Sequence, residues 1–274
     1  MVFIISLIVF VCAAGALAFI GYGYWHGQQN NKQLEQIGFN APDAAALQRM
    51  DLASFTVDWN ALRAINPDVV GWIYVPGTTV NFPIVHGTDD EHYLKTDFYG
   101  QTSWVSFGSI FLSAANAADF SDANNIVYGH HMNDGSMFSP FADFGDADTF
   151  NGHRTVYVFT PTANYQLTTF SIVHCAADDP LAQTTFASEQ ERQAYVQDKV
   201  DRSVVTVAGL PSAADMKHTF AFSTCDNLAS NGRWVLFAYE SGSTAAASSV
   251  VADDSNINPE DVAAVSEAAK ETAA

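Results

Sequence analysis

From residue 70 to residue 239 the chain consists mainly of short runs of β-branched and aromatic residues. Each run has the length of one strand, and turn residues such as Pro76-Gly77 and Asn133-Asp134-Gly135 separate the runs. Many short strands with regular turns are typical of a closed barrel or a sandwich, so we predict an all-β domain. The expected strands are Val70–Val75, Val80–Val85, Ser109–Leu112, Asn125–Tyr128, Thr155–Thr160, Gln166–Cys175, Thr219–Thr224 and Arg233–Tyr239.

The chain begins with an uncharged apolar segment, Val2–Trp25. A helix of this length can cross an apolar layer of about 30 Å. A cleaved signal peptide has a basic start and a shorter apolar stretch, whereas only Met1 precedes this one. The small residues around Cys12–Ala18 leave cleavage open as an alternative. We predict an uncleaved transmembrane anchor over residues 1–27, and its direction stays open because neither flank carries a Lys/Arg cluster.

Helices are expected on both sides of the first strands. Residues 28–65 begin with a polar stretch, Gln28–Asn40, that reads as a spacer or an exposed helix. Two short helices, Asp43–Leu52 and Val57–Ile65, are expected after it. A further helix, Glu189–Val204, follows from the capping-box sequence that starts at Ser188 and from apolar residues that repeat at helical spacing. This helix interrupts the series of strands.

The composition excludes several classes of protein. The chain has 30 Asp and Glu against 11 Lys and Arg, a net charge of −19, whereas nucleic-acid binding needs a surplus of basic residues. No nucleotide-binding glycine loop and no CxxC, HxxxH or HExxH pattern occurs, so no cofactor and no metal site are expected. The tail, residues 241–274, is acidic and rich in Ala and Ser, and we expect it to be disordered.

Three segments carry residues suited to acyl transfer. A strand runs into Gly129-His130-His131, another ends on Cys225, and the next begins with Arg233. A thiol with a pKa near 8.5 is only about 3% ionised at pH 7, so it needs a base such as imidazole to act as a nucleophile. A guanidinium offers a planar fork of donors to a developing oxyanion. By spacing alone, however, a lone cysteine at a strand end is more often a small apolar filler.

These segments resemble the catalytic set of the sortase family. Tyr128-Gly129-His130, then Ser223-Thr224-Cys225 and then Arg233 occur in the family's order. The resemblance covers about 175 residues, from Asn66 to Tyr239. The segments that resemble class B specifically are Asn66–Ile73, Phe82–Gly87, Tyr93-Leu94, Gly108–Phe111 and Asp134–Phe138.

The resemblance implies a closed eight-stranded barrel over residues 66–240, with short N-terminal helices and one helix inserted before the cysteine strand. It implies a cell-membrane enzyme with its catalytic domain outside a Gram-positive cell. Cys225 would attack the Thr carbonyl of a sorting-signal peptide, His130 would transfer protons and Arg233 would stabilise the oxyanion. An amine from a cell-wall precursor or a pilin lysine would then release the thioacyl enzyme.

The same resemblance implies a set of peptide-binding residues and two departures from the family pattern. Asp90 stands where an amide is expected, and Leu181 stands where a tyrosine is common, so the sorting motif cannot be carried over. The substrate-binding residues implied are Leu94, Asp90, Tyr128, Ser223 and Thr224.

Two alternatives remain open from the residues. Cys175 also ends an expected strand, and a disulfide with Cys225 would make the domain a non-catalytic module. A cysteine peptidase or amidase would use the same Cys225–His130 pair and transfer the acyl group to water. Only the resemblance favours an amine.

Overall fold

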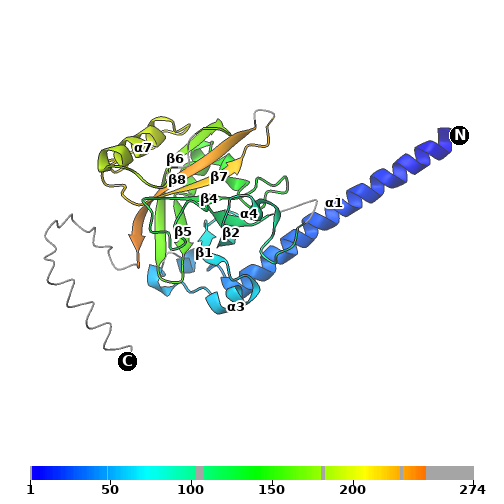
Figure 1. The fold of residues 1–274 in the computed structure, drawn as a ribbon, viewed down its shortest axis with the longest axis horizontal. Coiled ribbons are helices and arrows are strands. Elements are labelled where there is room, and N and C mark those ends of the chain that lie inside the picture. Colours follow the sequence, from blue (N-terminus) through cyan, green and yellow to red (C-terminus); the bar gives the residue numbers. More distant parts are fainter. Residues whose placement is uncertain (1, 48, 103–107, 180–182, 229–230, 245–274) are drawn as a thin grey trace, which may run out of the picture. The chain divides into compact units, whose positions relative to one another are not determined.

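The computed structural model describes residues 2–47, 49–102, 108–179, 183–228 and 231–244 (Figure 1). Eight strands form a closed barrel in the order β1-β2-β3-β4-β7-β8-β6-β5, so the prediction of an eight-stranded barrel is confirmed. Each expected strand is present, and β6 and β8 are longer than predicted. The strands are β1 (Val69–Tyr74), β2 (Asn81–His86), β3 (Ile110–Leu112), β4 (Asn124–Tyr128), β5 (Thr155–Phe159), β6 (Asn164–Ala176), β7 (Thr219–Cys225) and β8 (Gly232–Ser243).

The order of the strands places two distant segments beside each other. β4 pairs with β7 in parallel, from Asn124 opposite Thr219 to Tyr128 opposite Ser223. β7 pairs with β8 in antiparallel fashion, and β8 pairs with β6 on its other side. The ends of β4, β7 and β8 therefore meet at one end of the barrel.

The helices lie before the barrel and in its connections. They are α1 (Val2–Gly38), α2 (Ala44–Leu47), the 3₁₀ helix η1 (Leu52–Ser54), α3 (Trp59–Ile65), α4 (His92–Lys95), α5 (Pro140–Asp143), α6 (Ala147–Gly152) and α7 (Glu189–Asp201). The expected helix Asp43–Leu52 is thus only a single turn. The cap of α3 is Asp58, whose carboxylate accepts a hydrogen bond from the Ala61 N–H at 2.9 Å.

The inserted helix α7 begins where its sequence predicts and ends earlier. The Ser188 hydroxyl accepts a hydrogen bond from the Glu191 N–H, as in a capping box. The Glu191 carboxylate instead accepts one from Ala187, so the reciprocal bond of the motif is shifted by one residue. After Asp201 the chain leaves the helix, because the Val204 N–H donates to the Ile172 carbonyl of β6 at 2.9 Å.

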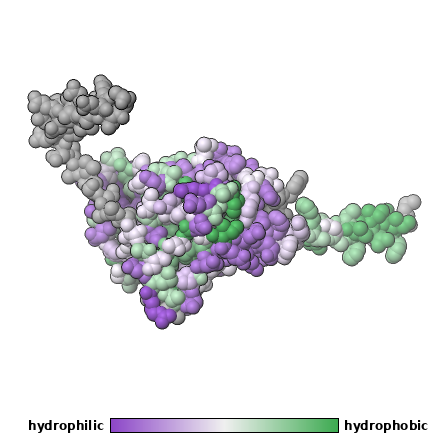
Figure 2. All heavy atoms as spheres, turned by 90° about the horizontal axis from the view of Figure 1, so that it is seen from below, coloured by the Kyte–Doolittle hydropathy of each residue, from purple (hydrophilic) through white to green (hydrophobic). Residues whose placement is uncertain are grey.

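Helix α1 continues without a break past residue 27 and packs on the barrel at its C-terminal end. Its first part is exposed and apolar, and within the described residues it is the one helix long and apolar enough to cross a membrane. Figure 2 shows this part in green, beside a barrel surface that is mostly purple and white. Leu34 and Gly38 are buried, and a Cβ on Gly38 would lie 2.6 Å from the ring of Trp72. Of the two alternatives for this polar stretch the helix is present, but its end joins the barrel core and is not exposed throughout.

Two hydrophobic clusters fix the barrel to its helices. The first joins the end of α1 and α3 to β1 and β5 through Trp72, whose indole N–H donates to Asn81 at 2.7 Å. The second lies under α7, where Tyr195 and Val196 pack on the outer face of β6, β7 and β8. Val235 and Ala221 belong to this second cluster. The alternate residues Phe220 and Phe222 instead stack with one another at 0% exposure.

Candidate active site

The predicted nucleophile and the predicted arginine are direct neighbours across two strands. Cys225 is the last residue of β7, Arg233 is the second residue of β8, and the two are paired in the antiparallel register. Residues paired in this way point to the same face of a sheet. Both side chains are partly exposed, so the pair lies at the surface of the barrel end.

The predicted base comes to the same place from β4. The Gly129 N–H donates to the Ser223 carbonyl at 3.1 Å, which extends the parallel pairing of β4 and β7 by one residue. Continued for one more residue, this pairing brings His130 level with Cys225. Gly129 is required there, because a Cβ would lie 2.5 Å from Ile110 and 2.6 Å from Phe138.

One hydrogen bond fixes the protonation pattern of the His130 ring. Its Nε2 lies 2.6 Å from the Leu94 carbonyl oxygen, which only accepts, so Nε2 carries a proton. In the neutral ring, Nδ1 is therefore the nitrogen that accepts a proton. The α4 turn thus orients the imidazole for proton transfer through its other nitrogen.

The second histidine holds the backbone of the cysteine. His131 Nδ1 donates to the Cys225 carbonyl at 2.8 Å, and the Asn227 side-chain amide donates to the His131 carbonyl at 2.8 Å. Asn227 has a φ of 56°, a left-handed conformation that asparagine tolerates better than most residues. We call these two bonds the His131–Asn227 clamp. It joins the segment after His130 to the segment after Cys225.

Among the described residues, the guanidinium of Arg233 is hydrogen-bonded through Nη1 alone. Nη1 donates to the Gly232 carbonyl at 2.9 Å and to the backbone and side-chain oxygens of Asn231 at 3.2 and 3.3 Å. Within the described residues, these bonds leave Nε and Nη2 for a substrate oxygen. The Asp226 N–H already donates to Gly232, so it does not contribute to an oxyanion hole in this arrangement.

Cys175 lies on the opposite side of Arg233 from Cys225. It is the β6 partner of Arg233, so β8 separates the two cysteines. Two strand spacings amount to about 9.5 Å, whereas a disulfide needs Cα atoms within about 7 Å. All three cysteines are free. The pairing of Cys175 with Cys225 therefore does not fit this barrel.

A buried carboxylate follows the cysteine. Asp226 accepts from the Leu228 N–H and lies 2.9 Å from His174 Nε2, and the His174 ring stacks on Trp234 with centroids 4.4 Å apart. A Cβ on Gly232 would overlap with the Asp226 carboxylate. These contacts fix the conformation of the turn between β7 and β8. No sequence pattern points to this group, because His174 is 52 residues away from Asp226 in the chain.

The five residues expected to bind peptide fall into two groups. Leu94 is exposed beside His130, Ser223 precedes Cys225 on its face of β7, and Tyr128 is half-buried at the end of β4. Burial raises the pKa of Tyr128, and the Asp90 carboxylate raises it further.

The other two expected residues do not face the site in the same way. The Asp90 oxygens accept from the Ser113 hydroxyl and the Ala114 N–H, so this carboxylate fixes the end of β3. Thr224 alternates with Cys225, is 2% exposed, and its hydroxyl has no hydrogen-bond partner among the described residues. Leu181 and the 245–274 part of the expected tail lie outside the described residues.

Comparison with known proteins places the chain in a family. No family model matches the sequence. Sortase B of Listeria monocytogenes is 29% identical over 218 residues, which cover 77% of this chain and 86% of the relative. Sortase B of Staphylococcus aureus is 30% identical over 169 residues, which cover 62% of this chain and 68% of the relative.

Solved structures agree with these relatives. Sortase B from Bacillus anthracis in complex with AAEK1 has a TM-score of 0.67 at 27% identity and covers 79% of this chain and 97% of that one. A S. aureus sortase B–substrate complex has a TM-score of 0.66 at 25% identity and covers 79% and 98%. The chain therefore belongs to the class B sortases, which are cysteine transpeptidases.

Proposed function

We propose that this sortase cleaves a C-terminal sorting motif after Thr and transfers the new acyl group to an amine. In the first step His130 takes the thiol proton of Cys225, the sulfur attacks the Thr carbonyl carbon, the C–N bond breaks, and His130 passes this proton to the leaving amine. In the second step an amine attacks the thioester, the C–S bond breaks, and His130 takes the proton of the amine and returns it to the Cys225 sulfur. Arg233 donates hydrogen bonds to the oxyanion in both steps.

The observation that carries this proposal is the strand register. Antiparallel pairing puts Arg233 opposite Cys225, and parallel pairing brings His130 to the same level. A substrate complex has been solved for sortase B of S. aureus, which supports a peptide substrate for this chain as well.

The proposal also assigns a place in the cell. Residues 1–27 would anchor the chain as a single span, with the barrel on the outer face of the membrane. The exposed apolar start of α1 supports the anchor. The acceptor would be a cell-wall precursor or a pilin lysine.

A peptide library tests the proposal on the full chain in detergent micelles. Threonine-containing peptides are supplied with and without hydroxylamine, and mass spectrometry identifies the products. We expect cleavage after Thr and a hydroxamate on that residue when hydroxylamine is present. Purely hydrolytic products under both conditions would support the peptidase alternative instead.

A further inference from the structure

A histidine of β6 holds the residue that follows the proposed nucleophile. The Asp226 side chain is 1% exposed, and its Oδ2 lies 2.9 Å from Nε2 of His174. A carboxylate oxygen only accepts, so Nε2 carries the proton of this bond. The His174 ring stacks on Trp234, its partner in the register of β6 and β8. Since β8 lies between β6 and β7 in the barrel, this histidine joins both neighbours of β8.

The same carboxylate fixes the backbone of the turn between β7 and β8. Its Oδ1 accepts from the Leu228 N–H at 2.9 Å, and the Asp226 N–H donates to the Gly232 carbonyl at 3.0 Å. Two residues of the turn, Asn227 and Asn231, have left-handed φ angles of 56° and 51°. Such angles cost free energy and persist where the surroundings determine the conformation. The shape of the turn therefore depends on how this carboxylate is held.

The turn carries the acceptors of the proposed oxyanion donor. Arg233 Nη1 donates to the Gly232 carbonyl at 2.9 Å and to the two oxygens of Asn231 at 3.2 and 3.3 Å. The Gly232 carbonyl is also the one that accepts from the Asp226 N–H. A shift of the turn therefore moves the guanidinium relative to Cys225, its partner on β7.

We propose that His174 is a positioning residue for transpeptidation and that it acts through Arg233. By donating to Asp226 it fixes the turn that aims the guanidinium at the oxyanion, and it transfers no proton in either step. This inference rests on the transpeptidase function proposed above. It adds a residue of β6 to the groups that determine the rate.

Two substitutions separate the hydrogen bond of His174 from its stacking. His174→Phe keeps a ring against Trp234 and removes the donor, whereas His174→Gln keeps an N–H donor near the place of Nε2. We expect His174→Phe to lower kcat about tenfold with little change in KM, because the oxyanion donor loses its position. His174→Gln should retain most of the parental kcat. The measurement is kcat and KM for peptide cleavage by the full chain in micelles.

A double variant tests whether the effect passes through the arginine. Arg233→Lys has no guanidinium to position, so His174→Phe added to it should change kcat by less than about twofold. A residue that merely supports the fold would lower kcat by the same factor in both backgrounds. Effects that multiply in the double variant therefore overturn the inference.

A second histidine–carboxylate pair provides a matched control. His218 Nδ1 lies 2.6 Å from Glu240, at the other end of the β7–β8 pair. His218→Phe removes the same kind of bond from the same two strands, away from the proposed site. We expect it to lower the temperature of thermal unfolding and to keep the parental kcat.

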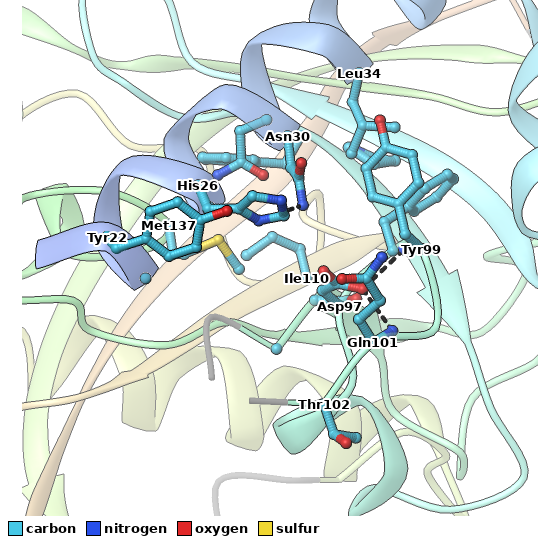
Figure 3. A pocket seen from close by; sticks show the side chains of 18 of the residues that line it. Tyr22, His26, Asn30, Leu34, Asp97, Tyr99, Gln101, Thr102, Ile110 and Met137 are labelled. Carbon is cyan, nitrogen blue, oxygen red and sulfur yellow. Dashed lines mark hydrogen bonds between the residues drawn. The ribbon is translucent and has the colours of Figure 1, made fainter. Parts of the chain in front are cut away.

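A histidine on α1 provides a further control. His26 lines a cavity of about 340 Å³ between α1 and the barrel, where its Nδ1 lies 3.4 Å from the Asn30 side-chain nitrogen (Figure 3). His174, Asp226 and Trp234 do not line this cavity. His26→Phe should therefore leave kcat unchanged.

Thermal unfolding of every variant separates loss of fold from loss of position. His174→Ala carries the same expectation as His174→Phe, so a folding defect caused by phenylalanine does not decide the outcome. Parental kcat in folded His174→Phe, or an equal loss in His218→Phe, overturns the inference. A parent that cleaves the peptide but transfers nothing to hydroxylamine contradicts the proposed function instead, because kcat for cleavage still reports on the position of Arg233.

Discussion

Two strand ends on either side of β8 carry a cysteine, and they differ in what surrounds the thiol. At the end of β6, the Cys175 sulfur lies 3.7 Å from the Arg233 carbonyl oxygen. Burial, followed by the charge of Asp179, raises the pKa of Cys175 to about 11. At the end of β7, Cys225 adjoins the segment of His130 and His131. Position at a strand end is common to both, so the histidine segment is what supports Cys225 over Cys175 as the proposed nucleophile.

Arg233, which lies between the two cysteines, also uses different atoms on its two sides. Its backbone carbonyl contacts the sulfur of Cys175, while its guanidinium donates through Nη1 to Asn231 and Gly232 in the turn that follows Cys225. One residue thus serves as a structural neighbour of one cysteine and as a proposed oxyanion donor for the other.

The largest difference in transpeptidation rate is expected between variants that lack one or the other thiol. Cys225→Ala is expected to reduce transpeptidation by about 10³-fold or more, because it removes the atom that forms the thioester. Cys175→Ala should leave turnover close to the parent. Rates of peptide transfer are measured for both, with thermal unfolding as the control for folding. A similar loss in the two variants would contradict the distinction between the sites.

Arg233→Lys is expected to have the next largest effect. Loss of one oxyanion donor costs about 10²–10³-fold in kcat, and the ammonium of lysine does not reproduce the planar fork. The measurement is kcat for peptide cleavage, and Arg63→Lys on the exposed face of α3 is the control. Parental kcat in Arg233→Lys would make this arginine structural.

The His131–Asn227 clamp should have an intermediate effect. His131→Phe removes the donor to the Cys225 carbonyl, and we expect kcat to fall about tenfold with little change in KM, since the reacting groups lose their mutual position. His131→Asn keeps an N–H donor near the place of Nδ1 and should restore most of kcat. Equal loss in both variants would show that the ring matters for another reason than this bond.

The smallest effect concerns the reactivity of Cys175. With its pKa raised to about 11, its thiol stays protonated at neutral pH. Only about one molecule in a thousand is ionised at pH 8, and this fraction rises about tenfold per pH unit until pH 11. Iodoacetamide labelling of Cys225→Ala, mapped by mass spectrometry, should follow this slope at Cys175. Labelling at pH 8 as fast as in urea-unfolded chain would contradict the burial of this thiol.

The fold could be predicted well from sequence because its signals are local. β-branched runs and turn residues locate the eight strands, and Ser188 marks the start of α7. The prediction left open what tertiary packing decides, namely whether the residues after Gln28 form a spacer or a helix. Residues after Gln28 look polar, yet α1 continues to Gly38, because Leu34 and Phe39 reach the barrel core.

The candidate site also has a part that the sequence predicts and a part that only the structure shows. Cys225, His130 and Arg233 stand out as chemical types at strand ends, and the strand register brings them together. The bond from His131 to Cys225 spans 94 residues, and that from His174 to Asp226 spans 52. No local pattern encodes such contacts, so only the closed barrel reveals them.

The most direct test of the central claim is to locate the acyl group on the enzyme. The full chain in micelles is incubated with a cleavable peptide, quenched in acid during turnover, digested and mapped by mass spectrometry. We predict a thioester on Cys225, absent from Cys175 and lost on addition of hydroxylamine. An acyl group on Cys175, or cleavage without any acylated cysteine, would contradict the assignment of Cys225 as the nucleophile.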